Sequence, residues 1–227
     1  MTEKMSTHTD FQPAKLSVYI ITFNEADKIA AAVQSVTWAD EVLVLDSNSS
    51  DDTAKIATEL GATIKQIPFT TFGKLRNDAI AACKHDWVFS LDADERCTPA
   101  AQAEIMRVLS QPDADAYYVP RRNWFMGRWI RHSGWYPDYR QPQLFRKSSM
   151  VFDDRDEVHE SYRVEGKIGY FEVGPKMAGT ITMRLDVVVW SSFAIYQPSH
   201  GIILVQVLRV GGQELDRLWP KGRDGFR

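Results

Sequence analysis

Two carboxylates separated by one residue, Asp92 and Asp94, directly follow an apolar run at residues 87–91. Alternate residues of an extended segment point the same way, so both carboxylates can reach one ligand. Their hard oxygens suit Mg²⁺ or Mn²⁺, and such an ion keeps open positions for the oxygens of a diphosphate. An Asp-x-Asp pair is common by chance, but its place after an apolar strand predicts a divalent metal cofactor that neutralises a leaving diphosphate.

Two earlier apolar runs also end in polar groups. Thr22 and Asn24 close the first run, and Asp46 follows the second. Each of these residues alone is equally well explained as a turn former that bonds its own backbone. Together they form a row of acceptors that can read the N–H of a uracil ring and the hydroxyls of a ribose. Gly-rich phosphate loops are absent from the sequence, so this predicted nucleotide site depends on the metal for its phosphate charge.

Lys74 and Arg76 stand near the start of the third predicted helix. A cation there could contact the phosphate or the base of a nucleotide. A solvated charge on a helix surface explains each of them equally well.

Alternating strands and helices must position these groups. Asn24 is expected to cap the first helix, Gly61 to follow the second, and Thr98 with Pro99 to begin the fourth, which runs to about Ser110. This alternation predicts a doubly wound α/β sheet, whose ligands sit beyond the carboxyl ends of the strands. The apolar runs expected to form strands lie at residues 16–22, 41–45, 62–67 and 87–91.

The composition is that of a globular protein and excludes several classes. Of 227 residues, 44% are hydrophobic and 25% charged, and the net charge of −3 gives no basic field, so we expect no nucleic acid partner. Cys83 and Cys97 are too few for a disulfide framework, which indicates a cytoplasmic location. No apolar stretch reaches the roughly 20 residues that span a bilayer, and the polar leader at 1–15 lacks a secretory signal.

Four motifs in a fixed order cover the strand ends and the third helix. They read Ile20-Ile21-Thr22-Phe23-Asn24-Glu25, Asp46-Ser47-Asn48-Ser49-Ser50-Asp51-Asp52-Thr53, Gly73-Lys74-Leu75-Arg76-Asn77 and Asp92-Ala93-Asp94-Glu95. Together they resemble the signatures of glycosyltransferase family 2. Within that family the sequence most resembles lipopolysaccharide core β-1,4-glucosyltransferases of the WaaE/KdtX type, helped by Val158-His159-Glu160-Ser161. The resemblance covers residues 16–171 and implies a GT-A fold, inversion at the anomeric carbon and a UDP-sugar donor.

The resemblance also implies roles for residues, carried over by position. Asp92 would face the ribose or the metal, and Asp94 matches the metal ligand. The residues expected to line the nucleoside pocket are Thr22, Asn24, Glu25 and Asp46, and Arg76 is expected to lie near it.

Inversion needs a base that removes the proton of the acceptor hydroxyl as it attacks, and a carboxylate suits this task. Glu160 matches the base position of the family, and Asp156 and Glu157 remain alternatives in the same acidic run. His159 could ligate the metal or orient the acceptor, and a structural histidine is equally consistent.

Arginines and aromatic residues alternate between 121 and 135. Arg121, Arg122, Trp124 and Trp135 could grip an anionic, lipid-linked saccharide at a membrane surface. A packed aromatic subdomain with its arginines in solvent is an equal alternative. With the resemblance, we expect a peripheral enzyme at the cytoplasmic face of the inner membrane that moves a hexose, expected to be glucose, onto a lipopolysaccharide inner core or related acceptor.

The expected glycosyltransferase domain spans residues 16–171, with a nucleotide-binding part at 16–98 and an acceptor part at 116–171. The tail at 172–227 departs from the family pattern, which makes a catalytically impaired nucleotide-binding protein one alternative. A sugar nucleotidyltransferase is the other. It would normally carry a Gly-rich basic segment where residues 22–25 stand here, which favours glycosyl transfer.

Overall fold

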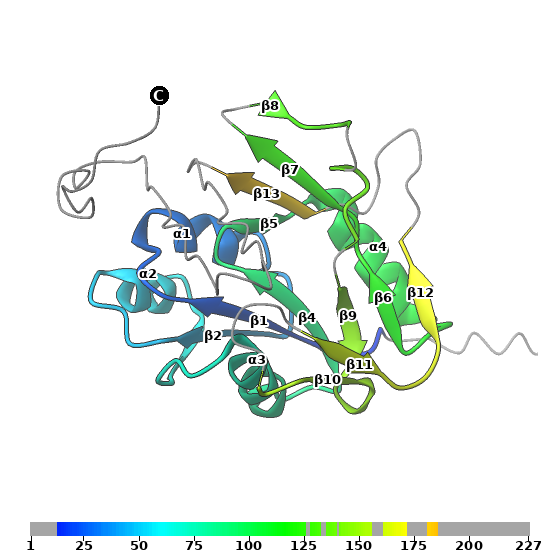
Figure 1. Cartoon of the computed structure of the whole chain (residues 1–227), viewed down its shortest axis with the longest axis horizontal. Coiled ribbons are helices and arrows are strands. Elements are labelled where there is room, and N and C mark those ends of the chain that lie inside the picture. The colour runs from blue at the N-terminus through cyan, green and yellow to red at the C-terminus, as the bar shows by residue number, and fades with distance from the viewer. Residues whose placement is uncertain are drawn as a thin grey trace, which may run out of the picture.

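The computed structural model describes residues 13–125, 128–132, 135–139, 141–155, 161–171 and 181–185. Its centre is a seven-stranded sheet with the strand order β12-β6-β9-β4-β1-β2-β3 (Figure 1). Every neighbouring pair is parallel except the two that involve β9, so the predicted doubly wound, mostly parallel sheet is confirmed. The strands are β1 (Leu16–Thr22), β2 (Glu41–Asp46), β3 (Thr63–Gln66), β4 (Trp87–Asp92), β6 (Ala116–Tyr118), β9 (Pro142–Arg146) and β12 (Ile168–Tyr170).

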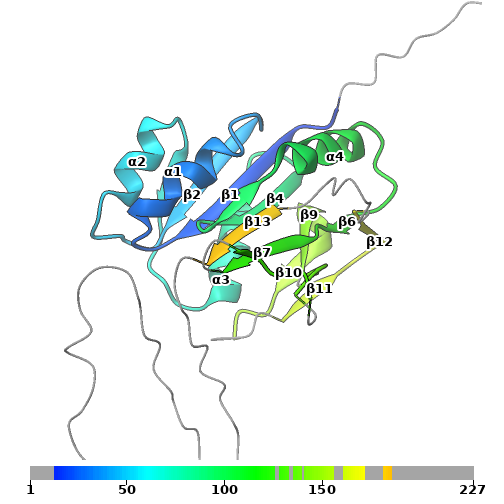
Figure 2. The ribbon, with the colours of Figure 1, turned by 90° about the horizontal axis from the view of Figure 1, so that it is seen from above.

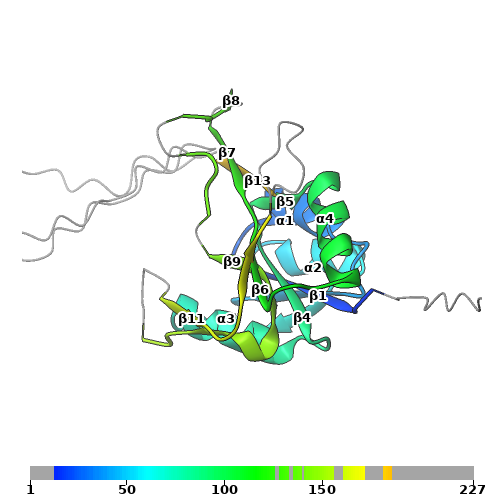
Figure 3. The ribbon, with the colours of Figure 1, turned by 90° about the vertical axis from the view of Figure 1, so that its right-hand side faces the viewer.

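Helices cover both faces of this sheet (Figure 3). They are α1 (Ala26–Gln34), α2 (Thr53–Glu59), α3 (Phe72–Ala82) and α4 (Pro99–Ser110), and a 3-10 turn η1 (Lys147–Ser149) follows β9. On one face, Ile29 of α1, Ala57 of α2 and Ile105 of α4 belong to one buried core cluster. On the other face, α3 packs through Leu75 and Ala79, beside the hairpin of β10 (Met150–Phe152) and β11 (Tyr162–Val164).

A second, four-stranded sheet has the order β5-β13-β7-β8. Its strands are β5 (Glu95–Cys97), β7 (Arg121–Phe125), β8 (Arg128–Trp129) and β13 (Ile181–Leu185). Figure 2 shows β13 beside β7, to which it is parallel, while it runs antiparallel to β5. Strand β13 lies within the segment expected to be an atypical tail, and its pairing joins that part of the chain to the strand that follows Asp94. No helix of the described residues is long and apolar enough to cross a membrane.

The helix boundaries follow their sequence signals with one exception. Thr98 caps α4 by accepting a backbone N–H of the first turn at 3.1 Å, and Gly61 follows α2 with φ of 87°. Asn24 was expected to cap α1, but Glu25 occupies that position and Asn24 has φ of 53°. This left-handed turn aims the Asn24 side chain at the next loop, where its oxygen accepts the N–H of Ser50 at 2.8 Å.

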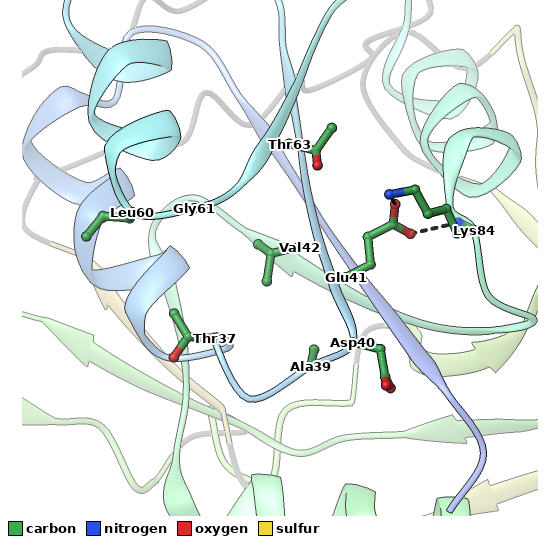
Figure 4. A pocket seen from close by; sticks show the side chains of 9 residues that line it. All are labelled: Thr37, Ala39, Asp40, Glu41, Val42, Leu60, Gly61, Thr63 and Lys84. Carbon is green, nitrogen blue, oxygen red and sulfur yellow. Dashed lines mark hydrogen bonds and ion pairs between the residues drawn. The ribbon is translucent and has the colours of Figure 1, made fainter.

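A small polar pocket of about 210 Å³ lies at the amino ends of the strands, the sheet edge opposite the predicted site (Figure 4). Glu41, at the start of β2, has a buried side chain there. Its carboxylate accepts the Ser17 hydroxyl at 2.5 Å and the Lys84 N–H at 2.7 Å, and it lies 3.3 Å from the Lys84 ammonium. These bonds tie β1, β2 and the connection between α3 and β4 together.

We expect Glu41→Gln to lower the free energy of unfolding by about 1–3 kcal/mol, because it removes a charge that three protein donors satisfy. Burial raises the pKa of Glu41, but hydrogen bonds from Lys84 and Ser17 outweigh it and hold the folded-state pKa below its ordinary value. The contribution is therefore complete above the unfolded-state pKa of about 4.3 and is lost as the pH falls through the folded-state value. Urea denaturation should show that the free energies of unfolding of Glu41→Gln and the parent differ less at pH 3 than at pH 7. The exposed Glu59→Gln is the control, and an undiminished difference at pH 3 would contradict the assignment.

Candidate functional site

A pocket of about 880 Å³ opens at the carboxyl edge of the large sheet. Its walls come from the ends of β1 and β2, the connection from β3 to α3, the first turns of α3 and the turn after β4. Five residues predicted to contact the donor or the metal line it: Thr22, Glu25, Arg76, Asp92 and Asp94. The structure thus brings together these predicted groups from three separate segments, at the edge where doubly wound sheets bind ligands.

Thr22 is the last residue of β1, and its side-chain oxygen is buried. Within the described part of the chain this oxygen has no hydrogen-bond partner. A buried hydroxyl without a partner is destabilising by about 1–3 kcal/mol, and a ligand in the pocket that bonds to it would remove that cost. Phe23, Phe69 and Phe72 supply exposed rings to the same pocket, and no sequence pattern indicated the last two.

Asn24 and Asp46 do not line the pocket but join the two loops beside it. The carboxylate of Asp46 is fully buried, and it accepts both the N–H and the hydroxyl of Ser49. The Ser49 oxygen in turn accepts the N–H of Asn24 at 2.8 Å. Their side-chain oxygens are engaged by protein donors, so here these residues fix the loop positions. Lys74 also lies outside the lining, and its ammonium pairs with Asp78 at 2.5 Å.

Arg76 projects from the second turn of α3 and is almost fully buried. Its guanidinium donates to the Ser90 hydroxyl and to the Asp92 carboxylate, each at 3.1 Å. The Phe152 ring lies on its other side, 5.7 Å from the guanidinium carbon. Arg76 therefore fixes the direction of one of the two paired carboxylates and supplies positive charge to the pocket wall.

The turn after β4 carries the carboxylates that could hold a cation. Burial and the neighbouring Asp92 carboxylate raise the pKa of Asp94 to about 6. A cation bound beside Asp94 would favour the ionised form of this carboxylate. Among the described residues, no group of three or more His, Cys, Asp or Glu side chains is arranged to hold a metal. Asp92 and Asp94 still fit Mg²⁺ or Mn²⁺, which often take one or two carboxylates and complete their shell with substrate phosphates and water.

The buried side chain of Glu95 fixes the position of this turn. One of its oxygens accepts the N–H of Asp92 at 3.0 Å and the amide of Gln143 at 3.3 Å, and the other lies 2.5 Å from the Arg121 guanidinium. Burial raises the pKa of Glu95 above its ordinary value, and the adjacent Arg121 charge offsets only part of this rise. Arg121 was expected to contact the acceptor, but its side chain is buried in the ion pair with Glu95 and does not lie on an open surface.

The rest of the arginine and aromatic segment is largely packed on itself. Arg122 and Arg131 both lie over the Trp129 ring, 5.0 Å and 4.2 Å from its centroid. Trp124 stands opposite Trp129 in the pairing of β7 with β8 and is half-buried. Trp135 is 41% exposed. Of the four residues predicted to contact the acceptor, Trp135 thus offers the most open surface.

Helix α3 also docks on the hairpin that leads to the predicted base. A Cβ on Gly73 would lie 2.0 Å from the carbonyl oxygen of Asp153, so only glycine permits this approach. The Asn77 amide donates to the carbonyl of Phe152 at 2.9 Å and accepts its N–H at 3.0 Å. The helix that carries Arg76 is therefore fixed to the strand that precedes residues 156–160.

The described residues do not include Asp156, Glu157, His159 and Glu160. Described residues on either side of that segment lie close together, because the N–H of Asp153 donates to the carbonyl of Ser161 at 2.9 Å. The roles of the base and of the histidine stay predictions.

Comparison with known proteins gives a family match over most of the described chain. Residues 17–183 match the family described as Glycosyl transferase family 2. An uncharacterized glycosyltransferase of Rickettsia felis is 40% identical over 104 residues, or 45% of this chain and 37% of that protein. LpsC, a lipopolysaccharide core biosynthesis glycosyltransferase of Rhizobium meliloti, is 27% identical over 169 residues, or 70% of this chain and 61% of LpsC. The matched part of this chain thus spans little more than a third of the Rickettsia relative.

Solved structures agree on the fold. The crystal structure of S. aureus TarS 1-349 superposes with a TM-score of 0.58 at 16% identity, covering 75% of this chain and 60% of that one. The same TarS fragment in complex with UDP-GlcNAc gives 0.57 at 17% identity, covering 75% and 58%. At this identity the likeness concerns the fold alone, and it confirms the predicted GT-A fold.

Proposed function

Since this chain belongs to glycosyl transferase family 2, we propose that it is an inverting glycosyltransferase that binds a UDP-hexose in the pocket at the carboxyl edge. The observation that carries the proposal is the convergence on one pocket of the Arg76 guanidinium, the Asp92 and Asp94 carboxylates and the buried Thr22 hydroxyl, which has no partner among the described residues. The hydroxyl can hydrogen-bond to a nucleoside, and the charged side chains can bind a diphosphate directly or through a metal ion.

The metal belongs to the proposal as well. Mg²⁺ or Mn²⁺ would be held by Asp94 and Asp92, and when bound it neutralises the leaving diphosphate. Arg76 keeps the Asp92 carboxylate in place, and Glu95 accepts the backbone N–H of Asp92. His159 is a further candidate ligand.

The acceptor is proposed to be a lipopolysaccharide inner core or a related lipid-linked saccharide, and the transferred sugar glucose. Two observations support this choice: the resemblance to core glucosyltransferases of the WaaE/KdtX type, and the 27% identity with LpsC. Glu160 would take the proton from the acceptor hydroxyl, with Asp156 and Glu157 as alternatives. We place the enzyme at the cytoplasmic face of the inner membrane as a peripheral protein, where Trp135 and Arg122 could approach the acceptor.

Two other functions make different demands on the site. A sugar nucleotidyltransferase would need a Gly-rich phosphate loop after β1, where this chain has a loop built by Asn24 and Ser50. A catalytically impaired nucleotide-binding protein would bind UDP but neither hydrolyse nor transfer the sugar. Donor hydrolysis with metal present separates this last reading from an enzyme.

The test is a thermal-shift screen of UDP-, GDP- and dTDP-sugars with Mn²⁺ and with chelator, followed by transfer of labelled glucose to inner-core oligosaccharide. A ligand at about 100 times its dissociation constant adds about 2.7 kcal/mol of stability. We expect stabilisation by UDP-sugars that depends on Mn²⁺, and transfer of glucose. Stabilisation by no nucleotide sugar would overturn the proposed donor site.

A further inference from the structure

Three tyrosine rings pack together where β6 and β12 end. Tyr118 and Tyr170 stack with their centroids 4.9 Å apart and their planes 9° apart. Tyr139 meets both rings edge-on, with centroid distances of 6.2 Å to Tyr118 and 5.6 Å to Tyr170. Tyr170 remains 60% exposed in spite of these contacts, the largest exposure among the large hydrophobic side chains of the described residues. Tyr170 is thus a solvent-exposed aromatic ring that packs against two other rings.

These rings lie at the same edge of the sheet as the donor pocket. Strands β6 and β12 run parallel to β4, so Tyr118, Tyr170 and Asp92 all stand at carboxyl ends. Figure 1 shows β6 and β12 side by side, and β9 alone separates β6 from β4. At about 4.8 Å per strand, β6 lies roughly 10 Å and β12, which carries Tyr170, roughly 14 Å from β4, a separation that a saccharide of a few sugar rings can span.

The cluster also lies on the same face of the sheet as the donor pocket. The hydroxyl of Tyr118 bonds to that of Tyr162 at 2.6 Å, and Tyr162 packs against the core cluster to which α3 contributes. Tyr162 follows the predicted base Glu160 by only two residues. The hydrogen bond therefore ties the tyrosine cluster to the strand that leaves the predicted base segment.

The rings are held in place before any ligand arrives. The Tyr139 hydroxyl donates to the carbonyl of Phe171 at 3.0 Å, and Tyr162 fixes Tyr118. A purely structural cluster would gain most by burying all of its rings, but Tyr170 is left open. A flat apolar face that is rigid, with hydroxyls at its rim, matches a pyranose ring, which presents C–H groups on its face and hydroxyls around its edge.

We propose that Tyr170, backed by Tyr118 and Tyr139, is a stacking subsite for a sugar ring of the saccharide acceptor. The inference rests on the proposed function in that it names where the acceptor of that same transfer is held. It assigns to the tyrosine cluster a part of the acceptor site that the arginine and aromatic segment was expected to supply.

The experiment measures two affinities separately for each protein. Inner-core oligosaccharide released from lipopolysaccharide by mild acid is titrated by ligand-observed NMR, and UDP with Mn²⁺ is titrated by calorimetry. Tyr170→Ala should weaken oligosaccharide binding about tenfold, because it removes the stacked face, and should leave UDP binding unchanged. Tyr170→Phe keeps the ring and should bind the oligosaccharide almost as the parent does.

Ile168→Ala is the matched control, since Ile168 lies two residues earlier on the same strand and is 39% exposed. It should change neither affinity. Oligosaccharide binding that is equal in Tyr170→Ala and the parent, or absent from the parent, overturns the subsite. Equal losses in Tyr170→Ala and Ile168→Ala overturn it as well. Absence of UDP binding would instead overturn the proposed function, and a selective oligosaccharide loss in Tyr170→Ala would still support the subsite.

Discussion

Asp94→Asn is expected to remove most of the Mn²⁺-dependent affinity for UDP and to lower hexose transfer by roughly 10² to 10³ fold, the scale found when one fixed electrostatic group is removed from a reaction centre. Asn keeps the size of the side chain but not the charge that attracts a cation. Burial and Asp92 already raise the pKa of Asp94 to about 6, so the carboxylate is under electrostatic strain that a bound cation relieves. Without the cation, the same substitution removes a repulsion.

This reasoning predicts opposite effects on binding and on stability. In chelator, Asp94→Asn should melt at the same temperature as the parent or higher, although its UDP affinity with Mn²⁺ is lower. Calorimetry with UDP, in Mn²⁺ and in chelator, measures the first effect, and thermal melting measures the second. Asp27→Asn makes the same charge change at an exposed position of α1 and should alter neither. An Asp94→Asn protein that binds UDP with unchanged affinity and metal dependence would contradict the metal assignment.

Local sequence signals predicted the half of the large sheet formed by β4, β1, β2 and β3 well. The apolar run that predicted a strand at 16–22 has the bounds of β1, and Thr98 with Pro99 began α4 as expected. Both signals lie within a few residues of the element they define. By contrast, β6 and β12 have three residues each and pair across about fifty positions, so no local period reveals them. Strand β13 fell in the expected tail for the same reason.

The same limit applies to the site. Asp92 and Asp94 were found because a strand end places its polar residues at one edge of the sheet. Glu95 and Arg121 were missed as a pair, since their contact depends on how β5 and β7 meet in space. An arginine in an aromatic run carries no local sign of a buried partner, and Arg121 was therefore taken for an exposed cation. For Asn24, the sequence indicated a turn but could not separate a helix cap from a left-handed residue.

Glu160→Gln is expected to lower glucose transfer by roughly 10² to 10⁴ fold and to leave UDP-sugar binding within about twofold of the parent. A base acts on the acceptor hydroxyl in the transition state and contributes little to donor affinity. Gln preserves the size and the hydrogen bonding of the side chain but cannot take the proton. Transfer has to be measured with inner-core acceptor, because water as an acceptor would bypass the positioning on which the base depends.

The neighbouring acidic residues provide the controls for this assignment. Asp156→Asn and Glu157→Gln lie in the same run, and with Glu160 as the base they should lower transfer only slightly. The three substitutions share one flanking anchor, the contact of Asn77 with Phe152, so a general disturbance of the hairpin would affect all of them alike. Near-normal transfer by Glu160→Gln with a large loss in one neighbour would move the base to that neighbour. A loss confined to Glu160→Gln, with UDP binding intact, places the proton transfer at this carboxylate, because donor binding and the hairpin are then both unchanged.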